Sequence, residues 1–299
     1  MIVQGKVAFI GLGVMGGPMA GHLLSAGNRL AVFNRTRSRA ESWLEEQGNR
    51  GRSAEIAATP ALAAQGAEIV ITCVGNDEDL REVTLGADGA FSAIEPGALF
   101  IDHTTVSANM ARELGAAAGE QGFMTLDAPV SGGQAGAVSG KLAVMCGGTG
   151  EAFERARPVM GAYGARIVHV GACGAGQTAK MANQMCIAGI LQGLSEAIRL
   201  TVAAGLDTDK VLEAISGGAA QSWQMENRWP TMVKDEFDFG FAVDWMRKDL
   251  GYALEEADRL GLVSPVTAMV DKFYAEIQQT GGGKLDTSSL IRRLPRGNT

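Results

Sequence analysis

Residues 7–16 read Val-Ala-Phe-Ile-Gly-Leu-Gly-Val-Met-Gly, and this stretch decides the fold. Four apolar residues typical of a buried strand lead into glycines spaced GxGxxG, and a helical pattern follows over residues 17–26. The first glycine permits a tight turn, the second lets the backbone approach a pyrophosphate, and the third lets helix and strand pack closely. A glycine-rich turn can be purely structural, but this strand–turn–helix context favours dinucleotide binding. The predicted contacts in the turn are Gly11, Leu12, Gly13, Val14 and Met15.

Apolar, β-rich runs alternate with helical stretches through the first 170 residues. Such alternation predicts an α/β fold with a mostly parallel, doubly wound sheet of the Rossmann type. The expected strands are residues 7–11, 30–34, 69–74, 99–103, 124–128, 142–146 and 167–170. The expected helices include residues 17–26, 37–47, 108–120 and 151–163.

The pattern changes near Gly171, and residues 177–204 read as one long helix that is apolar nearly all round. Its length is about 40 Å at the usual rise per residue. More helical stretches follow, with Asp207 as a candidate cap and Ser264-Pro265 as a cap with proline at the first helical position. We therefore predict a Rossmann domain over residues 1–170 and an all-α domain for substrate and oligomerisation over residues 171–299, joined by the long helix.

Charge and composition narrow the class of protein. The formal net charge of −7 argues against a nucleic-acid binder, which needs a basic face. No run reaches the roughly 20 apolar residues that span a bilayer, so no membrane contact is expected. The four cysteines form no CxxC pair and lie in apolar stretches, which predicts reduced core residues in a cytoplasmic protein. No cluster of His, Cys, Asp or Glu has the spacing of metal ligands, so no metal is expected.

The end of the second expected strand indicates which dinucleotide is bound. An NAD enzyme usually has an acid there for the ribose 2′-hydroxyl, but this chain has Asn34-Arg35-Thr36-Arg37. A guanidinium can hold a 2′-phosphate in a bidentate contact, whereas a carboxylate would repel it. The alternative is that the two arginines are solvated loop charges. The missing acid favours NADP(H), with Asn34, Arg35 and Thr36 as cofactor-binding residues.

Four separated signatures make the chain resemble the β-hydroxyacid dehydrogenase family, which includes 3-hydroxyisobutyrate dehydrogenases and semialdehyde reductases. They are the glycine turn of residues 11–16 with Pro18-Met19-Ala20, Asp-Ala-Pro-Val-Ser-Gly-Gly at 127–133, residues 174–184, and Lys-Asp-Leu at 248–250. The resemblance covers nearly the whole chain. It implies an NADPH-dependent oxidoreductase that interconverts a small carboxylate-bearing semialdehyde and its hydroxy acid. The candidate substrates are tartronate, methylmalonate, succinic and sulfonated semialdehydes and glyoxylate.

In this family the lysine of the third signature is the general acid/base, and it corresponds to Lys180. Near the start of an apolar helix, desolvation and the helix dipole should lower the pKa of such a lysine toward the working range. Asn183 lies on the same helical face and would orient the lysine or the substrate oxygen. Gln184 stands where some relatives have a second Asn, and we expect it to contact substrate. The alternative for Lys180 is a lysine that extends from a helix end into solvent.

Other positions take expected roles from the same resemblance. Ser131-Gly132-Gly133 resembles the substrate loop, where bare N–H groups beside a hydroxyl can cradle a carboxylate; the alternative is a plain turn. Lys248 resembles a lysine near the nicotinamide, although it could be an exposed helical lysine. Val74 and Thr105 match positions that touch the cofactor. Phe241 would wall the substrate pocket, as Trp223 could, although aromatic residues in a helical domain more often belong to the core.

His103 offers a rival acid/base, because many dehydrogenases use histidine and this one ends a strand. Its neighbours form no recognisable triad, so we assign it no proton transfer. Two other functions stay open: imine reduction on the same scaffold, and a non-catalytic NADPH-binding scaffold. Lys180 argues against imine reduction, and Lys180 together with the net charge of −7 argues against the scaffold. The small residues of the helical half also predict a homodimer or homotetramer.

Overall fold

A computed structural model describes residues 5–48 and 53–295. The chain forms two compact units, Met1–Lys180 and Met181–Thr299. The division lies within one helix, α8 (Ala175–Ala203). The α/β fold class with a helical second part is confirmed, whereas the predicted domain boundary at residue 170 stays a prediction.

A nine-stranded sheet forms the centre of the first unit, with the order β3-β2-β1-β4-β5-β6-β8-β7 and β9 beside β8. The pairs from β3 to β6 are parallel, as is β8 with β9, whereas β8 runs antiparallel to β6 and β7. The strands are β1 (Lys6–Ile10), β2 (Arg29–Phe33), β3 (Ala54–Ile56), β4 (Ala67–Thr72), β5 (Leu99–Asp102), β6 (Met124–Asp127), β7 (Val130–Ser131), β8 (Leu142–Gly148) and β9 (Gly164–Gly171).

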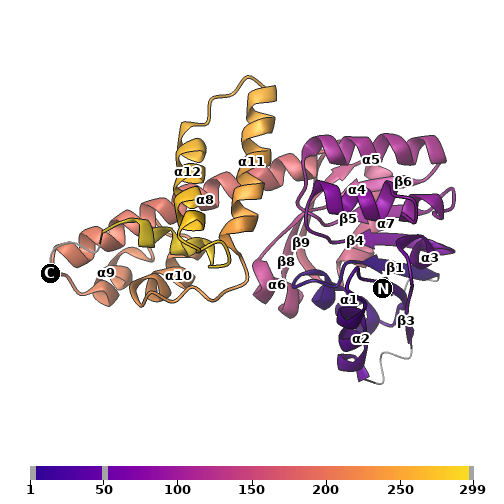
Figure 1. Cartoon of the computed structure of the whole chain (residues 1–299), viewed down its shortest axis with the longest axis horizontal. Coiled ribbons are helices and arrows are strands. Elements are labelled where there is room, and N and C mark those ends of the chain that lie inside the picture. The colour runs from indigo at the N-terminus through magenta and orange to yellow at the C-terminus, as the bar shows by residue number, and fades with distance from the viewer. Residues whose placement is uncertain (1–4, 49–52, 296–299) are drawn as a thin grey trace. The chain divides into compact units, whose positions relative to one another are not determined.

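Helices cover both faces of this sheet, as a doubly wound fold requires (Figure 1). Alternation along β1 shows why: Val7 and Phe9 enter one core, and Ala8 and Ile10 enter the other. The first face carries α1 (Gly16–Ser25), α2 (Arg37–Glu46), α6 (Gly133–Ser139) and α7 (Gly150–Met160). The second face carries α3 (Pro60–Ala64), α4 (Asp77–Leu85), the 3-10 turn η2 (Ala90–Ser92) and α5 (Ala108–Gln121).

All seven expected strands are present within a few residues of their predicted ends, but β3 and β7 were not predicted. β3 has three residues, none fully buried, so it lacks an apolar run. β7 has only two residues and lies within the second signature, paired with β8. Both strands are made by tertiary pairing rather than by local sequence preference.

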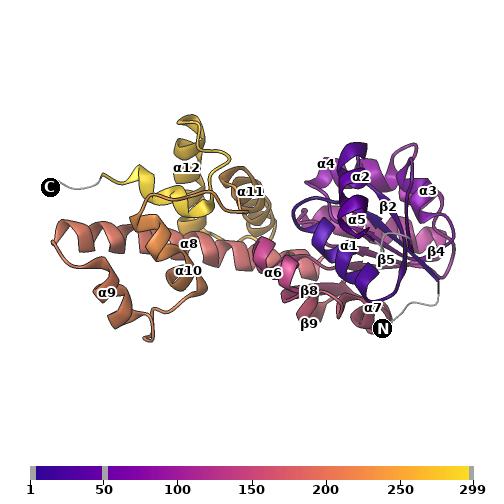
Figure 2. The same cartoon turned by 90° about the horizontal axis from the view of Figure 1, so that it is seen from below.

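The second unit is helical, with its helices gathered along α8 (Figure 2). Its core is built around the fully buried side chains of Trp229 and Tyr274. Asp207 caps the helix after α8, as predicted, by accepting bonds from two backbone N–H groups. The remaining elements are α9 (Thr208–Ile215), α10 (Trp223–Val233), α11 (Val243–Arg259), α12 (Pro265–Gln279) and the 3-10 helix η3 (Thr287–Arg293).

Two expectations about apolar sequence have different outcomes: the absence of membrane contact stays a prediction, and the placement of all four cysteines in the core is wrong. α8 is long and apolar enough to cross a bilayer, although the core helix of a soluble protein passes the same test and one such helix is weak evidence. Counting continuous apolar runs missed it because its apolar residues are interrupted by small and amide side chains. The four cysteines are free thiols, but only Cys146 is buried, and Cys186 is exposed. A cysteine in an apolar stretch of a helix can still face outward.

Candidate active site

Backbone atoms pack closely against two of the glycines in the turn after β1. Gly11 has a positive φ of 100°, and a Cβ there would lie 2.2 Å from the carbonyl oxygen of Cys73. A Cβ on Gly16 would lie 1.9 Å from the Gly11 oxygen. Around Gly13, in contrast, no atom beyond its immediate chain neighbours lies within 4 Å of the Cβ position. The turn itself therefore needs the first and third glycines, while the second leaves the open approach that a pyrophosphate requires.

Asn34 joins this turn to the loop after β2. Its side-chain oxygen accepts a hydrogen bond from the Leu12 N–H at 2.9 Å, and its amide nitrogen donates to the Thr36 carbonyl at 2.9 Å. The next residue, Arg35, is mostly exposed and pairs with Asp79 of α4 at 2.5 Å. Exposed ion pairs contribute little stability, so this guanidinium can exchange its partner for an anionic ligand at small cost.

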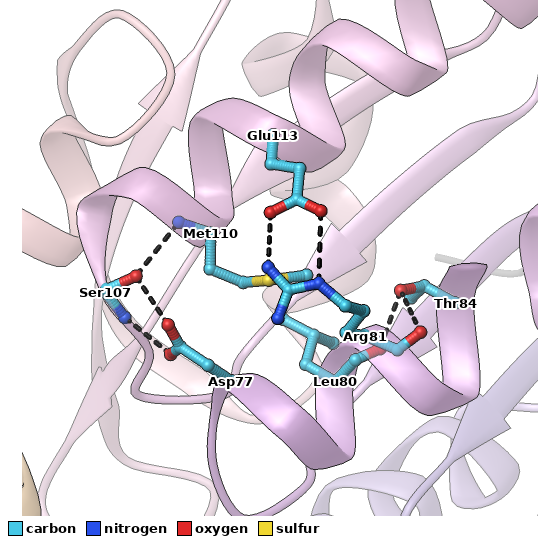
Figure 3. Close-up of polar contacts among 7 residues, drawn as sticks. All are labelled: Asp77, Leu80, Arg81, Thr84, Ser107, Met110 and Glu113. Atoms are coloured by element: carbon cyan, nitrogen blue, oxygen red, sulfur yellow. Dashed lines mark hydrogen bonds and ion pairs between the residues drawn. The ribbon is translucent and has the colours of Figure 1, made fainter. Parts of the chain in front are cut away.

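The loops after β4 and β5 are fastened to each other at the carboxyl edge of the sheet (Figure 3). The Asp77 carboxylate accepts bonds from the Ser107 N–H at 2.9 Å and from the Ser107 hydroxyl at 2.6 Å. The Ser107 hydroxyl in turn caps α5 at Met110. One turn along each helix, Arg81 and Glu113 form an ion pair. These contacts hold together the two loops that carry Val74 and Thr105, two of the predicted cofactor residues.

Val74 and Thr105 lie in those two loops, and both are half-buried. The Val74 N–H donates to the Thr104 hydroxyl at 3.1 Å, which links the loops directly beside both predicted positions. The predicted cofactor residues up to Thr105 lie in the glycine turn and in the loops after β2, β4 and β5. One hydrogen bond joins the loop after β2 to the glycine turn, and another joins the loops after β4 and β5. The structure places them at the edge of the sheet where dinucleotides bind in such folds.

Lys180 lies in the second turn of α8 with only 8% of its surface exposed. Its Nζ donates a hydrogen bond to the Val130 carbonyl at 2.8 Å, immediately before Ser131. Gly132 and Gly133, which follow, both have positive φ angles and are exposed. The structure thus brings the predicted acid/base next to the predicted substrate loop, although about 50 residues separate them in the sequence.

Two buried polar residues, Asp127 and Gln177, hold the start of α8 near Lys180. The sequence analysis assigned no role to either. The Asp127 carboxylate accepts bonds from the backbone N–H groups of Gly174 and Gln177. Burial raises the pKa of Asp127 to about 6, and those N–H donors work against the rise. Asp127 and Gln177 both lie in the signatures that carry the family resemblance. The signal in the sequence was an acid, Asp127, near the end of an expected strand.

In the second unit, four polar residues form one chain of contacts. Asn183 donates its amide N–H to the Gln184 oxygen at 2.8 Å, and Gln184 donates to the Asp249 carboxylate at 2.6 Å. Lys248 Nζ lies 3.1 Å from the other Asp249 oxygen. The structure therefore joins three predicted site residues, Asn183, Gln184 and Lys248, through an acid that was quoted only as part of a signature.

The two aromatic residues predicted to wall the substrate pocket, Phe241 and Trp223, have other contacts in the second unit. Phe241 is half-buried and packs against the helical core, which matches the alternative given for it. Trp223 is more than half exposed at the start of α10, and the Arg228 guanidinium lies 5.1 Å from its ring centroid. Pocket roles for both stay predictions.

His103 is engaged by protein at both ring nitrogens. Nδ1 lies 2.6 Å from the Ala128 carbonyl, which can only accept, so this nitrogen carries the proton. Nε2 lies 2.7 Å from the Tyr163 hydroxyl and accepts a hydrogen bond from it. Burial lowers the pKa of His103 to about 4, so the ring is neutral at physiological pH. A buried neutral histidine with both nitrogens occupied has no proton to offer a substrate.

Comparison with known proteins identifies the family. Residues 6–171 match the model of the NAD-binding domain of 6-phosphogluconate dehydrogenase, and residues 174–294 match the NAD-binding domain of NADP-dependent 3-hydroxyisobutyrate dehydrogenase. The chain belongs to the β-hydroxyacid dehydrogenase family. Members of this family are NAD(P)-dependent hydroxyacid dehydrogenases, and this chain is an oxidoreductase of that kind with an NAD(P)-binding Rossmann domain.

Individual members of the family resemble the chain over almost its whole length. An uncharacterized oxidoreductase of Shewanella frigidimarina is 54% identical over 98% of this chain and 99% of its own. An NAD-dependent L-serine dehydrogenase of Pseudomonas aeruginosa is 37% identical, with 97% of each chain covered. The structure of Mycobacterium tuberculosis 3-hydroxyisobutyrate dehydrogenase with L-serine superposes with a TM-score of 0.87 at 32% identity, covering 97% and 99% of the two chains.

The neutral state of His103 leads to a testable pH dependence. At pH 5 an unfolded chain protonates this histidine, whose ordinary pKa is near 6.5, whereas the native state with a pKa of about 4 does not. Stability from His103 is therefore lost as pH falls from 6.5 toward 4, by roughly 1–2 kcal/mol at pH 5. The change in Tm from pH 7.5 to pH 5 should be less unfavourable for His103→Gln than for the wild type, by a few degrees, because the variant has no buried histidine to protonate.

Comparing the wild type with His103→Gln cancels the effects of the buried carboxyl groups that both proteins contain. Burial raises the pKa of Asp102 to about 7 and that of Asp127 to about 6, and these groups act in the opposite direction. Turnover of His103→Gln should stay near the wild-type value. Equal pH-induced Tm changes in both proteins would mean that His103 is not held neutral.

Proposed function

We propose that this protein is an NADPH-dependent dehydrogenase that interconverts a small carboxylate-bearing semialdehyde and its hydroxy acid, with Lys180 as general acid/base. The observation that carries the proposal is the 2.8 Å bond from Lys180 Nζ to the Val130 carbonyl. It places a buried ammonium beside the glycine loop of residues 131–133. This arrangement favours a dehydrogenase over imine reduction or a non-catalytic scaffold.

The chemistry needs one hydride and one proton. A bound nicotinamide dinucleotide supplies the hydride that reduces the carbonyl carbon, or accepts it in the reverse direction. Lys180 donates its proton to the carbonyl oxygen as the hydroxy acid forms, which leaves a neutral amine that solvent reprotonates. In oxidation the amine takes the hydroxyl proton. The Val130 carbonyl accepts one N–H of Lys180, which holds the side chain beside the proposed substrate loop.

Recognition of the substrate carboxylate is assigned to Ser131, Gly132 and Gly133. Because the two glycines lack side chains and are exposed, their N–H groups can approach an anion closely. Ser131 adds a hydroxyl donor. Asn183, Gln184 and Phe241 are proposed to complete the substrate contacts, and Lys248 to lie near the nicotinamide. The homo-oligomeric state and the cytoplasmic location stay predictions.

Preference for NADPH is assigned to the loop after β2. It has no acid at the position that would bind a ribose 2′-hydroxyl, and it presents the Arg35 guanidinium to solvent. A 2′-phosphate could replace Asp79 as the partner of this arginine. The bond between Asn34 and Leu12 supports the assignment because it keeps Arg35 beside the glycine turn.

Replacement of Arg35 tests the cofactor preference. Arg35→Ala should weaken NADPH binding by about 10- to 100-fold, since a charge-assisted contact is worth roughly 1.5–3 kcal/mol. NADH binding should change little. Arg39→Ala, an exposed arginine in α2, provides the matched control and should affect neither cofactor. The measurements are Kd and KM for both cofactors; a wild-type enzyme with equal kinetics for NADH and NADPH would contradict the assignment.

A panel of short aldehydes tests the proposed substrate class. Purified protein with NADPH should reduce at least one carboxylate-bearing semialdehyde, followed by absorbance at the nicotinamide band. The matched aldehyde without an acid group should be much poorer. Ser131→Ala should raise KM for the preferred substrate with a smaller loss of kcat, because it removes one donor to the carboxylate. Equal kcat/KM for the aldehydes with and without a carboxylate would argue against this substrate loop.

A further inference from the structure

The first turn of α8 is built on the carboxylate of Asp127, at the end of β6. Oδ1 accepts the N–H of Gly174 at 2.7 Å, and Oδ2 accepts the N–H of Gln177 at 2.9 Å. Asp127 is only 4% exposed. The first N–H groups of a helix have no partners within the helix, and here a buried side chain at the end of a strand accepts that of Gln177, together with that of Gly174 just before the helix. The negative charge also faces the positive end of the helix dipole.

Two glycines enclose this carboxylate so tightly that its position is determined from both sides. A Cβ on Gly147 of β8 would lie 2.5 Å from Asp127 Oδ1. A Cβ on Gly176 of α8 would lie 2.7 Å from Oδ2 and 2.5 Å from the Met145 carbonyl oxygen. Strand β8 and the start of α8 can therefore approach the carboxylate only because both positions lack side chains.

Gln177 extends the same anchor to the loop after β5. Its side chain is fully buried. Nε2 donates to the Thr104 carbonyl at 2.7 Å, and Oε1 accepts the Val106 N–H at 3.2 Å. These two bonds lie on either side of Thr105, a predicted cofactor residue. The residue whose backbone binds Asp127 thus also holds a loop assigned to the cofactor.

Lys180 lies three residues after Gln177, about one helical turn from the anchor. Its acceptor, the Val130 carbonyl, lies three residues after Asp127 on the segment that leads to Ser131. Both ends of the Lys180–Val130 contact are therefore attached to one carboxylate. A shift of the helix start relative to this segment would displace the ammonium from the substrate loop.

We propose that Asp127 is a positioning residue for the reaction: its buried carboxylate keeps Lys180 aligned with the substrate loop, and Gln177 aligns the same helical turn with the cofactor loop. This inference rests on the proposed role of Lys180. Asp127 does not touch the substrate in this scheme. It acts through the start of α8, so its removal should affect the rate of the chemical step more than the binding of either ligand.

Asp127→Asn tests the inference with little change in shape. The amide offers one acceptor where two N–H groups need one each, and its NH₂ opposes the second donor. Since small displacements of a catalytic group can cost about 100-fold in rate, we expect kcat to fall by about 10- to 100-fold. KM for NADPH should stay within about threefold. The deuterium isotope effect with NADPH labelled at the transferred position should rise toward its full value as chemistry becomes limiting.

Two further variants separate positioning from loss of stability. Asp127→Ser keeps a single short acceptor and should also lose kcat, which provides a second test if the amide variant folds poorly. Phe91→Leu removes packing from the other core of the first unit, against Phe100 and Phe123 near the starts of β5 and β6 rather than at the carboxyl end where Asp127 lies, and should lower Tm while kcat stays near wild type. Tm is measured for each protein, and kinetics are taken well below it.

The outcomes distinguish this inference from the proposed function. If wild-type enzyme reduces a carboxylate-bearing semialdehyde and folded Asp127→Asn or Asp127→Ser keeps wild-type kcat and isotope effect, Asp127 has only a structural role and the inference is wrong. If the wild-type enzyme reduces no such substrate, the proposed function is wrong, whatever the Asp127 variants do. A selective loss of kcat with a raised isotope effect supports the positioning role.

Discussion

The long helix α8 begins among buried residues, so its first backbone N–H groups need acceptors that water cannot provide. Asp127 accepts the N–H groups of Gly174 and Gln177 at the helix start, and much of the candidate site follows from that requirement. The carboxylate reaches the helix start because β6 ends beside β8, and the close approach requires glycine at positions 147 and 176. Lys180 is then held near Val130, and Gln177 is held against the loop after β5. One buried acid connects three parts of the first unit.

The cofactor side depends on similar links between loops rather than on single residues. Asn34 ties the glycine turn to the loop that carries Arg35, while Asp77 and Ser107 fasten the loops after β4 and β5. Loops are in general more mobile than the strands and helices that they connect. Holding them before ligand binds lowers the ordering cost of binding, which suits a site that must align two ligands.

Sequence patterns predicted the features that depend on local preference. The run Val7–Ile10 and the glycines after it determine a strand and turn without help from distant residues, and Asp207 caps its helix through its immediate neighbours. The short strands β3 and β7 were missed because pairing creates them. The role of Asp127 was missed because its partners, Gly174 and Gln177, lie almost 50 residues away. Cys186 faces outward because exposure depends on which side of α8 it occupies.

The most direct test of the central claim is the rate of hydride transfer in a single turnover with Lys180 replaced. With saturating NADPH and the preferred semialdehyde, Lys180→Ala should lose at least about 100-fold in this rate, the usual contribution of a positioned acid/base. NADPH binding, measured separately, should persist. Lys180→Arg should not restore the rate, because arginine keeps the charge but does not release its proton near neutral pH. A near-wild-type rate for Lys180→Ala would contradict the assignment of Lys180 as the acid/base.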